Sequence, residues 1–270
     1  HWDSWIPGHP DFGVQRPWSP NPDNVKNFFE TGIKNTTSLS FAKGGEDYSF
    51  RATARASQNA AVVPNAQRDV YDLNISGEID LTDNVSIYSS LNARLQQTDN
   101  YASSGYGSLA SNFSQWWQRQ LDMDRLEQNY YYNGAFYTWN RRSARNARPQ
   151  YWDAPHYEQY WNTNANENST YSGNFGINID LADGLTGNVE VKRRAYTRHN
   201  WSRSYVGVNT LNTTPGYSEG SYNQSFNQLL AKLNYRTDIT EDLDLNAIVG
   251  YTADQNKWVS TSAGTVGGLQ

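Results

Sequence analysis

The chain has 270 residues, with 22 Lys and Arg against 27 Asp and Glu and no Cys, and its formal net charge is −5 at pH 7. The absence of Cys excludes disulfides and thiolate metal sites, and the mild charge without a basic stripe argues against a nucleic-acid partner. A mean hydropathy of −0.83 with 14% aromatic residues is unusual for a globular enzyme but suits polar loops and aromatic belts.

Two further patterns are missing from the sequence. No stretch approaches the roughly 18 consecutive apolar residues of a membrane helix. The four histidines, His1, His9, His156 and His199, lie far apart and show no metal-ligand spacing. We therefore predict no catalytic residue, no metal and no cofactor, and we expect the chain not to be an enzyme.

The sequence of residues 1–23 predicts an irregular N-terminal segment. Residues 1–23 are rich in Pro and Trp, which predicts neither helix nor strand. We expect a short helix from Asn24 to Gly32, because Asn24 can cap its start and Gly32 can end it.

One short turn pattern occurs three times in the sequence. The copies run from Asp80 to Val85, from Asp180 to Leu185 and from Asp238 to Leu243, each with an apolar residue, a small residue, an acid, a turn residue and an apolar residue. Asn, Asp and Gly tolerate the backbone of tight hairpins. We therefore predict three hairpins closed by the same kind of turn.

Apolar and polar residues alternate on both sides of each turn, as they do in strands. We expect eight strands, at about residues 36–43, 46–59, 68–81, 85–97, 171–181, 185–198, 224–239 and 243–257. About ten residues of period 2 cross a bilayer as a tilted strand. Short turns at one end and long loops at the other are typical of an outer-membrane β-barrel.

A soluble β-sandwich with one solvent-exposed face would show the same alternation. Two features favour the barrel. The polar face carries charged and amide side chains on nearly every strand, as a water-filled or plugged lumen requires. Several strands are also longer than the usual five or six residues. The first residues lack the charged and apolar regions of a signal peptide, and we expect a leader to precede them.

The long loop, at about residues 98–170, is predicted to be extracellular and to carry a helix from Ser114 to Gln128. An aromatic tract follows the helix. These side chains either stack on sugar rings and contact a partner, or pack on one another to hold the loop compact, and the sequence favours the second. The aromatic candidates are Trp116, Trp117, Tyr130, Tyr131, Tyr132, Trp139, Trp152 and Trp161.

The segment from Asn21 to Gly32, read with the following Asn35 to Ser38, resembles the plug-to-barrel region of SusC/RagA-type TonB-dependent transporters of Bacteroidetes. The segments Val63 to Arg68 and Trp116 to Met123 are similar to an outer loop and a recurring helix of that family. Ala60-Ala61 departs from the family, where a Gly is expected. The resemblance covers residues 15–130 well and the remainder mainly by its strand pattern.

This resemblance implies a 22-stranded outer-membrane barrel with a plugged lumen, of which the chain would supply about eight strands. It implies residues 1–35 as the plug-to-barrel segment and 36–270 as part of the barrel. Its partners would be a SusD-like surface lipoprotein lid, TonB through a plug domain that this chain does not contain, and outer-membrane lipid or lipopolysaccharide. The implied function is the import of oligosaccharides or peptides.

Charged residues on the polar strand faces are then expected to line the lumen and touch the plug, or simply to be solvated on a wet face. The candidates are Arg51, Arg55, Asp72, Glu78, Arg94, Glu190, Lys192 and Arg194. Two alternatives to import stay open: a small closed outer-membrane barrel, or a SusC-like structural subunit of a surface assembly that binds a ligand or partner without import.

Overall fold

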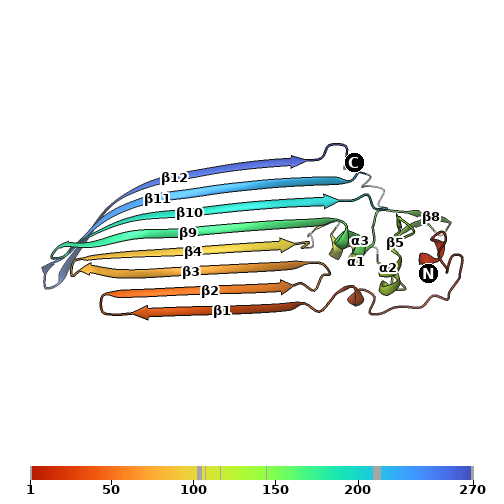
Figure 1. Ribbon diagram of the computed structural model, residues 1–270, viewed down its shortest axis with the longest axis horizontal. Coiled ribbons are helices and arrows are strands. Elements are labelled where there is room, and N and C mark those ends of the chain that lie inside the picture. Colours follow the sequence, from red (N-terminus) through yellow and green to blue (C-terminus); the bar gives the residue numbers. More distant parts are fainter. Residues whose placement is uncertain are drawn as a thin grey trace.

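The computed structural model describes residues 2–101, 105–106, 108–115, 117–143, 145–208 and 214–268. Its main feature is one antiparallel sheet of eight long strands, each beside its neighbour in chain order (Figure 1). The strands are β1 (Ile33–Gly44), β2 (Tyr48–Ala60), β3 (Gln67–Thr82), β4 (Val85–Asp99), β9 (Thr163–Ala182), β10 (Leu185–Ser204), β11 (Gly216–Thr240) and β12 (Leu243–Gly264). The sheet is not closed, and β1 and β12 form its two edges.

The eight predicted strands and their antiparallel order are confirmed, but the last four are longer than predicted. β9 begins at Thr163 and β11 at Gly216, each eight residues before the predicted start. These extensions are rich in Asn, Ser and Gly and do not alternate in hydropathy, so their periodicity gives no strand signal. The backbone ladder between neighbouring strands holds them instead.

All the short turns lie at one end of the sheet, the turn end, and all the long connections at the other, the loop end (Figure 1). The loop-end connection between β4 and β9 spans residues 100–162, so it is shorter than the predicted loop. Each of the three repeated turns has a register shift beside it, at Asp80/Thr82, Leu185/Thr186 and Asp238/Thr240. The shared sequence pattern thus produces a shared local geometry.

The three turns use two different devices. Where the small residue is Thr, its hydroxyl accepts a backbone N–H two residues later: Asn84 N bonds Thr82 Oγ1 at 3.3 Å, and Asp242 N bonds Thr240 Oγ1 at 3.4 Å. The second copy has Ala182 instead, and Gly184 adopts φ +70°. A Cβ on Gly184 would lie 2.0 Å from the Arg236 carbonyl oxygen, so this position needs glycine.

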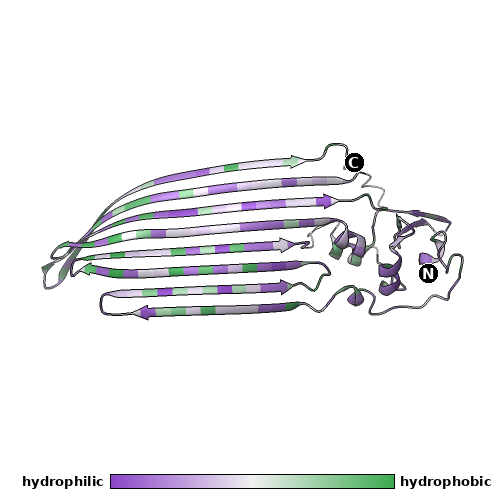
Figure 2. Cartoon of the chain, viewed as in Figure 1, coloured by the Kyte–Doolittle hydropathy of each residue, from purple (hydrophilic) through white to green (hydrophobic). Residues whose placement is uncertain are grey.

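Register assigns every side chain of the sheet to one of two faces, because successive residues of a strand point to opposite sides. The apolar face carries Leu73, Leu91, Phe175, Val191 and Leu229, which are register neighbours or lie two residues apart along a strand. The opposite side is the polar face. Hydrophobic and hydrophilic residues accordingly alternate along the strands in Figure 2.

Apart from the loop end, where α3 contacts β9 and Ala165 is buried, neither face of the sheet is covered by other described parts of the chain. The five apolar-face residues just named are 39–48% exposed. A soluble sandwich would bury this face under a second sheet, and in the part of the chain that the structure describes no such layer is present. The sheet therefore exposes a mainly apolar surface over its turn-end half.

The buried core of the molecule lies at the loop end and not on the sheet. We call this compact unit the loop-end cap; it comprises the described residues of 2–32 and 105–162. Its core consists of Trp2, Ile6, Phe28, Leu121, Met123, Leu126, Trp139, Ala154 and Tyr157. Its elements are η1 (Trp2–Trp5), η2 (Lys26–Phe28), α1 (Leu109–Gln115), α2 (Met123–Asn129), β5 (Tyr131–Tyr132), β6 (Ala135–Phe136), β7 (Arg141–Ser143), β8 (Asn146–Pro149) and α3 (Pro155–Tyr160).

The N-terminal segment is part of this cap, and it reaches β1 from the loop end (Figure 1). Within it, only the 3-10 turn η2 replaces the helix that we expected from Asn24 to Gly32. The assignment of residues 1–35 to a plug-to-barrel segment and of 36–270 to a partial barrel stays a prediction.

The predicted helix from Ser114 to Gln128 is wrong in its extent, because two shorter helices, α1 and α2, replace it. Asn21 and Asn24 explain the break. Their side-chain amides donate to the carbonyls of Gln118, Gln120 and Leu121, which a continuous helix would use itself. Asp122 then caps α2 by accepting from the first backbone N–H groups. Among the described residues, no helix is long and apolar enough to cross a membrane.

The turn geometry predicts that Gly184→Ala destabilises the sheet. A side chain at φ +70° and a Cβ 2.0 Å from the Arg236 oxygen should together cost roughly 1–3 kcal/mol. Gly250→Ala is the matched control in β12, because its Cβ would meet Ala231 O at an ordinary 3.6 Å. Urea unfolding of the full-length protein in detergent checks this prediction, and equal midpoints for the two variants would contradict it.

Candidate functional site

The polar face carries all eight charged residues that the sequence assigns to the lumen. Arg55 on β2 is the register partner of Asp72 on β3, and Asp72 is that of Arg94 on β4. Register partners point to the same side of a sheet. The pairing continues across β9 and places on this face Arg51, Glu78, Glu190, Lys192 and Arg194 as well.

Two ion pairs account for part of this charge. Lys192 Nζ lies 2.9 Å from Glu190 Oε2, and Arg94 lies 3.7 Å from Asp72. The remaining cations of the set have no ion pair or hydrogen bond within the described residues; they are Arg51, Arg55 and Arg194. The polar face therefore offers guanidinium groups that are free to bind carboxylates or phosphates.

Glu190 is the centre of a polar network that the sequence reading did not identify. Although it lies on an open sheet face, it is only 7% exposed. Asn174 Nδ2 donates to it at 2.6 Å, and Lys192 pairs with its other oxygen. The Asn174 side-chain oxygen in turn accepts from the backbone and the hydroxyl of Ser90. The network thus joins β4, β9 and β10 through side chains.

A glycine makes a second link across the same three strands possible. Gly176 of β9 lies on the polar face between Tyr88 of β4 and Glu190 of β10. A Cβ there would fall 2.2 Å from the Tyr88 ring, so the ring occupies the space that a side chain would take. Tyr88 can therefore reach β10, where its hydroxyl accepts from Asn188 Nδ2 at 3.1 Å. The only sequence signal was a glycine at a polar-face position of a strand.

The described members of the predicted aromatic set lie in the cap, where they contact one another or other rings of the cap. Trp117 packs edge-on against Trp139, with ring centroids 5.3 Å apart, and Trp139 is 1% exposed. Tyr131 and Trp161 both contact Phe136. The other rings pair in the same way: Tyr130 with His156, Tyr132 with His9 and Trp152 with Tyr106. Trp116 lies outside the described residues.

This packing leaves few of these rings open to a ligand. Trp139 is buried, and a buried ring cannot stack on a sugar. Tyr131, at 46% exposure, is the most exposed of the members that the structure describes. The mutual packing agrees with the second reading of the aromatic tract, and ligand stacking by the exposed members stays a prediction.

A buried ion pair fastens the N-terminal segment to the cap. Asp3 is 0% exposed, and Arg125 of α2 donates to it from Nε at 2.7 Å. Arg125 also pairs with Asp11, which a second cation, Arg16, approaches to 3.0 Å. The hydrogen bond from Arg125 lowers the pKa of the Asp11 carboxyl below its ordinary value.

Burial also shifts the pKa values of two side chains of α3, His156 and Tyr157. Desolvation lowers the pKa of His156 to about 4, and the ring lies edge-on to Phe28 and stacked on Tyr130. It raises the pKa of Tyr157 as well, whose hydroxyl donates to Tyr205 O at 2.6 Å. Both side chains are uncharged near neutral pH, which suits a packing role. In the described part of the chain, no three His, Asp or Glu side chains group to hold a metal ion.

Two solved structures contain a segment with the fold of this sheet. The structure of the RagAB peptide transporter matches 92% of this chain and 27% of its own, with a TM-score of 0.67 and 14% sequence identity. The RagAB peptide importer in its "closed-closed" state matches 94% of this chain and 28% of its own, with a TM-score of 0.68 and 16% identity. The eight-stranded antiparallel sheet therefore matches part of the barrel in these structures.

The two matched structures are much longer than this chain, and their sequence identity to it is low. The chain spans about a quarter of the length of the two structures that it matches. No protein-family model matches the sequence, and no curated protein does. At these identities the comparison establishes the fold, and the open sheet corresponds to part of a barrel wall.

The ion pair between Arg125 and Asp3 predicts that Arg125→Gln releases the N-terminal segment from the cap. Removing one partner leaves the buried Asp3 carboxylate unpaired, which typically costs about 3–5 kcal/mol. Hydrogen exchange in the full-length protein should then be faster at residues 2–13 but unchanged in β9. Arg119→Gln is the matched control, because the exposed Arg119 side chain has no partner among the described residues. Slow exchange at residues 2–13 in Arg125→Gln would contradict this role.

Proposed function

We propose that this chain is a wall segment of an outer-membrane, TonB-dependent transporter of the SusC/RagA type. The observation that carries the proposal is the match of over nine-tenths of the chain to a segment of the RagAB structures, combined with the two unlike faces of the sheet. The resemblance of the Asn21 to Gly32 segment to the same family supports it independently. The proposed activity is import and needs no catalytic residue.

The apolar face supports an outer-membrane position. Soluble monomers rarely expose a contiguous apolar patch of more than a few hundred Å², yet this face stays open from β1 to β12. Outer-membrane barrels have an apolar band about 25 Å tall, short periplasmic turns and long extracellular loops. We therefore infer that the apolar face contacts lipid, that the turn end is periplasmic and that the loop-end cap is extracellular.

The polar face supports a lumen through which polar solutes pass. Its network around Glu190 is fixed by hydrogen bonds, while Arg51, Arg55 and Arg194 remain unpaired. Such cations attract acidic groups, either of a plug or of a substrate. RagAB is a peptide transporter, and a peptide with a free carboxylate would suit these guanidinium groups. We propose peptides or oligosaccharides as the substrate class.

The loop-end cap is the proposed docking site for a SusD-like lipoprotein lid. Its aromatic core makes it compact, so it would give a partner a preformed surface. Exposed rings such as Tyr131, at 46%, and Tyr106, at 83%, lie on it. Tyr side chains are enriched where protein surfaces bind each other.

One alternative keeps the barrel without import. A SusC-like structural subunit of a surface assembly would use the same apolar face in lipid and the same cap for a partner. The two functions differ in energy coupling, because only import requires TonB and the proton-motive force.

The proposal predicts a charge-sensitive, energy-dependent uptake. In cells that carry the full-length protein, a labelled acidic peptide should enter, and a protonophore should abolish its entry. Arg194→Glu on the polar face of β10 should lower uptake at least about threefold by repelling the substrate. Arg203→Glu is the control, because Arg203 belongs to the same strand but points to the opposite side.

Three results decide the test. Loss of uptake in Arg194→Glu alone supports import along the polar face. Equal uptake by both variants contradicts a role for that face. Partner binding without energy-dependent uptake of peptides or oligosaccharides favours the structural subunit.

A further inference from the structure

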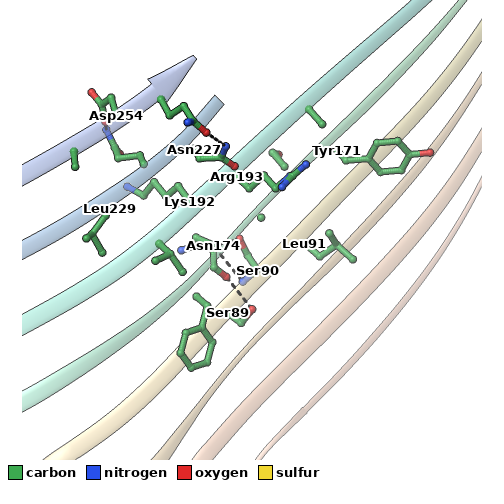
Figure 3. A pocket seen from close by; sticks show the side chains of 18 residues that line it. Ser89, Ser90, Leu91, Tyr171, Asn174, Lys192, Arg193, Asn227, Leu229 and Asp254 are labelled. Atoms are coloured by element: carbon green, nitrogen blue, oxygen red, sulfur yellow. Dashed lines mark hydrogen bonds between the residues drawn. The ribbon is translucent and has the colours of Figure 1, made fainter. Parts of the chain in front are cut away.

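A groove of ≈ 770 Å³ lies on the sheet where β4, β9, β10 and β11 run side by side (Figure 3). Small-molecule pockets have a similar volume, about 300–1,000 Å³. On the apolar face its floor is Gly173 of β9, flanked in register by Leu91 of β4 and Arg193 of β10. A Cβ on Gly173 would lie only 2.8 Å from the Ser90 carbonyl oxygen, so the floor stays without a side chain.

The walls of the groove are mainly apolar toward the turn end and polar toward the loop end. Phe175, Val191 and Leu229 line it toward the turn end, and each of them is 40–48% exposed. Arg193 and Tyr171 line it toward the loop end, and Figure 3 shows the Arg193 side chain extending across β9 toward Tyr171. The groove is therefore amphipathic along its length.

Arg193 is a cation without a counterpart. It has no ion pair, hydrogen bond or ring contact within the described residues. The acid that follows on the same face of β9 is Glu167, whose register partner His199 lies six residues beyond Arg193, about 20 Å along the strand. Lys192 and Asp254, which also line the groove, belong to the polar face.

Arg193 lies near the loop-end border of the apolar band. β10 starts at Leu185 beside its turn, and eight residues at about 3.3 Å each extend roughly 26 Å. A strand tilt of about 40° reduces this to roughly 20 Å, close to the top of an apolar band about 25 Å tall. Tyr171 beside it is a residue type enriched at membrane–water interfaces. From there the long Arg193 side chain can extend to the lipid headgroups on the loop-end side.

We propose that this groove binds a phosphorylated glycolipid of the outer leaflet, of the lipid A class. An acyl chain would lie over Gly173 between Leu91 and Val191, and Arg193 would pair with a phosphate. Guanidinium groups bind phosphate oxygens bidentately, and the low dielectric beside lipid strengthens the pair. The inference rests on the proposed position of the sheet in the outer membrane and not on import.

Native mass spectrometry of the full-length, detergent-purified protein tests the site with two probes, diphosphoryl lipid A and phosphatidylethanolamine. The wild type should retain lipid A in preference. Arg193→Gln should lower lipid A retention about tenfold, since a charge-assisted pair is lost. Arg193→Lys keeps the charge without the bidentate geometry and should fall between. Arg194→Gln, the next residue on the opposite face, should retain lipid A like the wild type.

Equal lipid A retention by the wild type and Arg193→Gln would overturn the proposal. Equal losses in Arg193→Gln and Arg194→Gln would also overturn it, because they would mark an unspecific charge effect. Should Arg193→Gln fail to fold, the wild type decides: lipid A without its phosphates should bind about tenfold more weakly, and equal binding contradicts the pair. Uptake is not measured, so failure of import leaves this result unaffected.

Discussion

The structure depends on one constraint, the period of two residues that an antiparallel ladder imposes on its side chains. Because the register is continuous from β1 to β12, a shift of one residue in any strand would exchange its apolar and charged sets. The three repeated turns fix that register at the turn end, and each has its own irregularity beside it. From this single constraint follow an apolar face that suits lipid and a polar face that suits a lumen.

The two ends of the sheet are built on different physical principles. The turn end needs only local chemistry: a Thr hydroxyl or a glycine at positive φ closes each repeated hairpin. The loop end needs tertiary contacts between segments about a hundred residues apart. Asn21 and Asn24 bind the carbonyls of residues 118–121, and Arg125 holds Asp3. The docking surface that we propose therefore lies on a compact cap rather than on a free loop.

Sequence reasoning was accurate where structure is local and periodic. It predicted all eight strands, their hairpins and the common face of the eight charged residues from Arg51 to Arg194. It failed where distant contacts override local preference. The helix from Ser114 to Gln128 is divided because amides from the N-terminal segment bind its carbonyls, and the polar loop-end extensions of β9 and β11 form strands without alternation. The link from Tyr88 to Asn188 depends on the absence of a side chain at Gly176, and the sequence gives no more sign of it than a glycine at a polar-face position.

We propose that the sheet divides lipid from lumen, and residue-by-residue access to lipid tests this division. The 270 residues contain no Cys, so single cysteines at positions 87 to 92 of β4 can be labelled with a fluorophore in the full-length protein and reconstituted with lipids that quench fluorescence. We expect strong quenching at Ile87, Ser89 and Leu91, which lie on the apolar face, and weak quenching at Tyr88, Ser90 and Asn92, which lie on the polar face. Uniform quenching along the strand, or the opposite alternation, would contradict it.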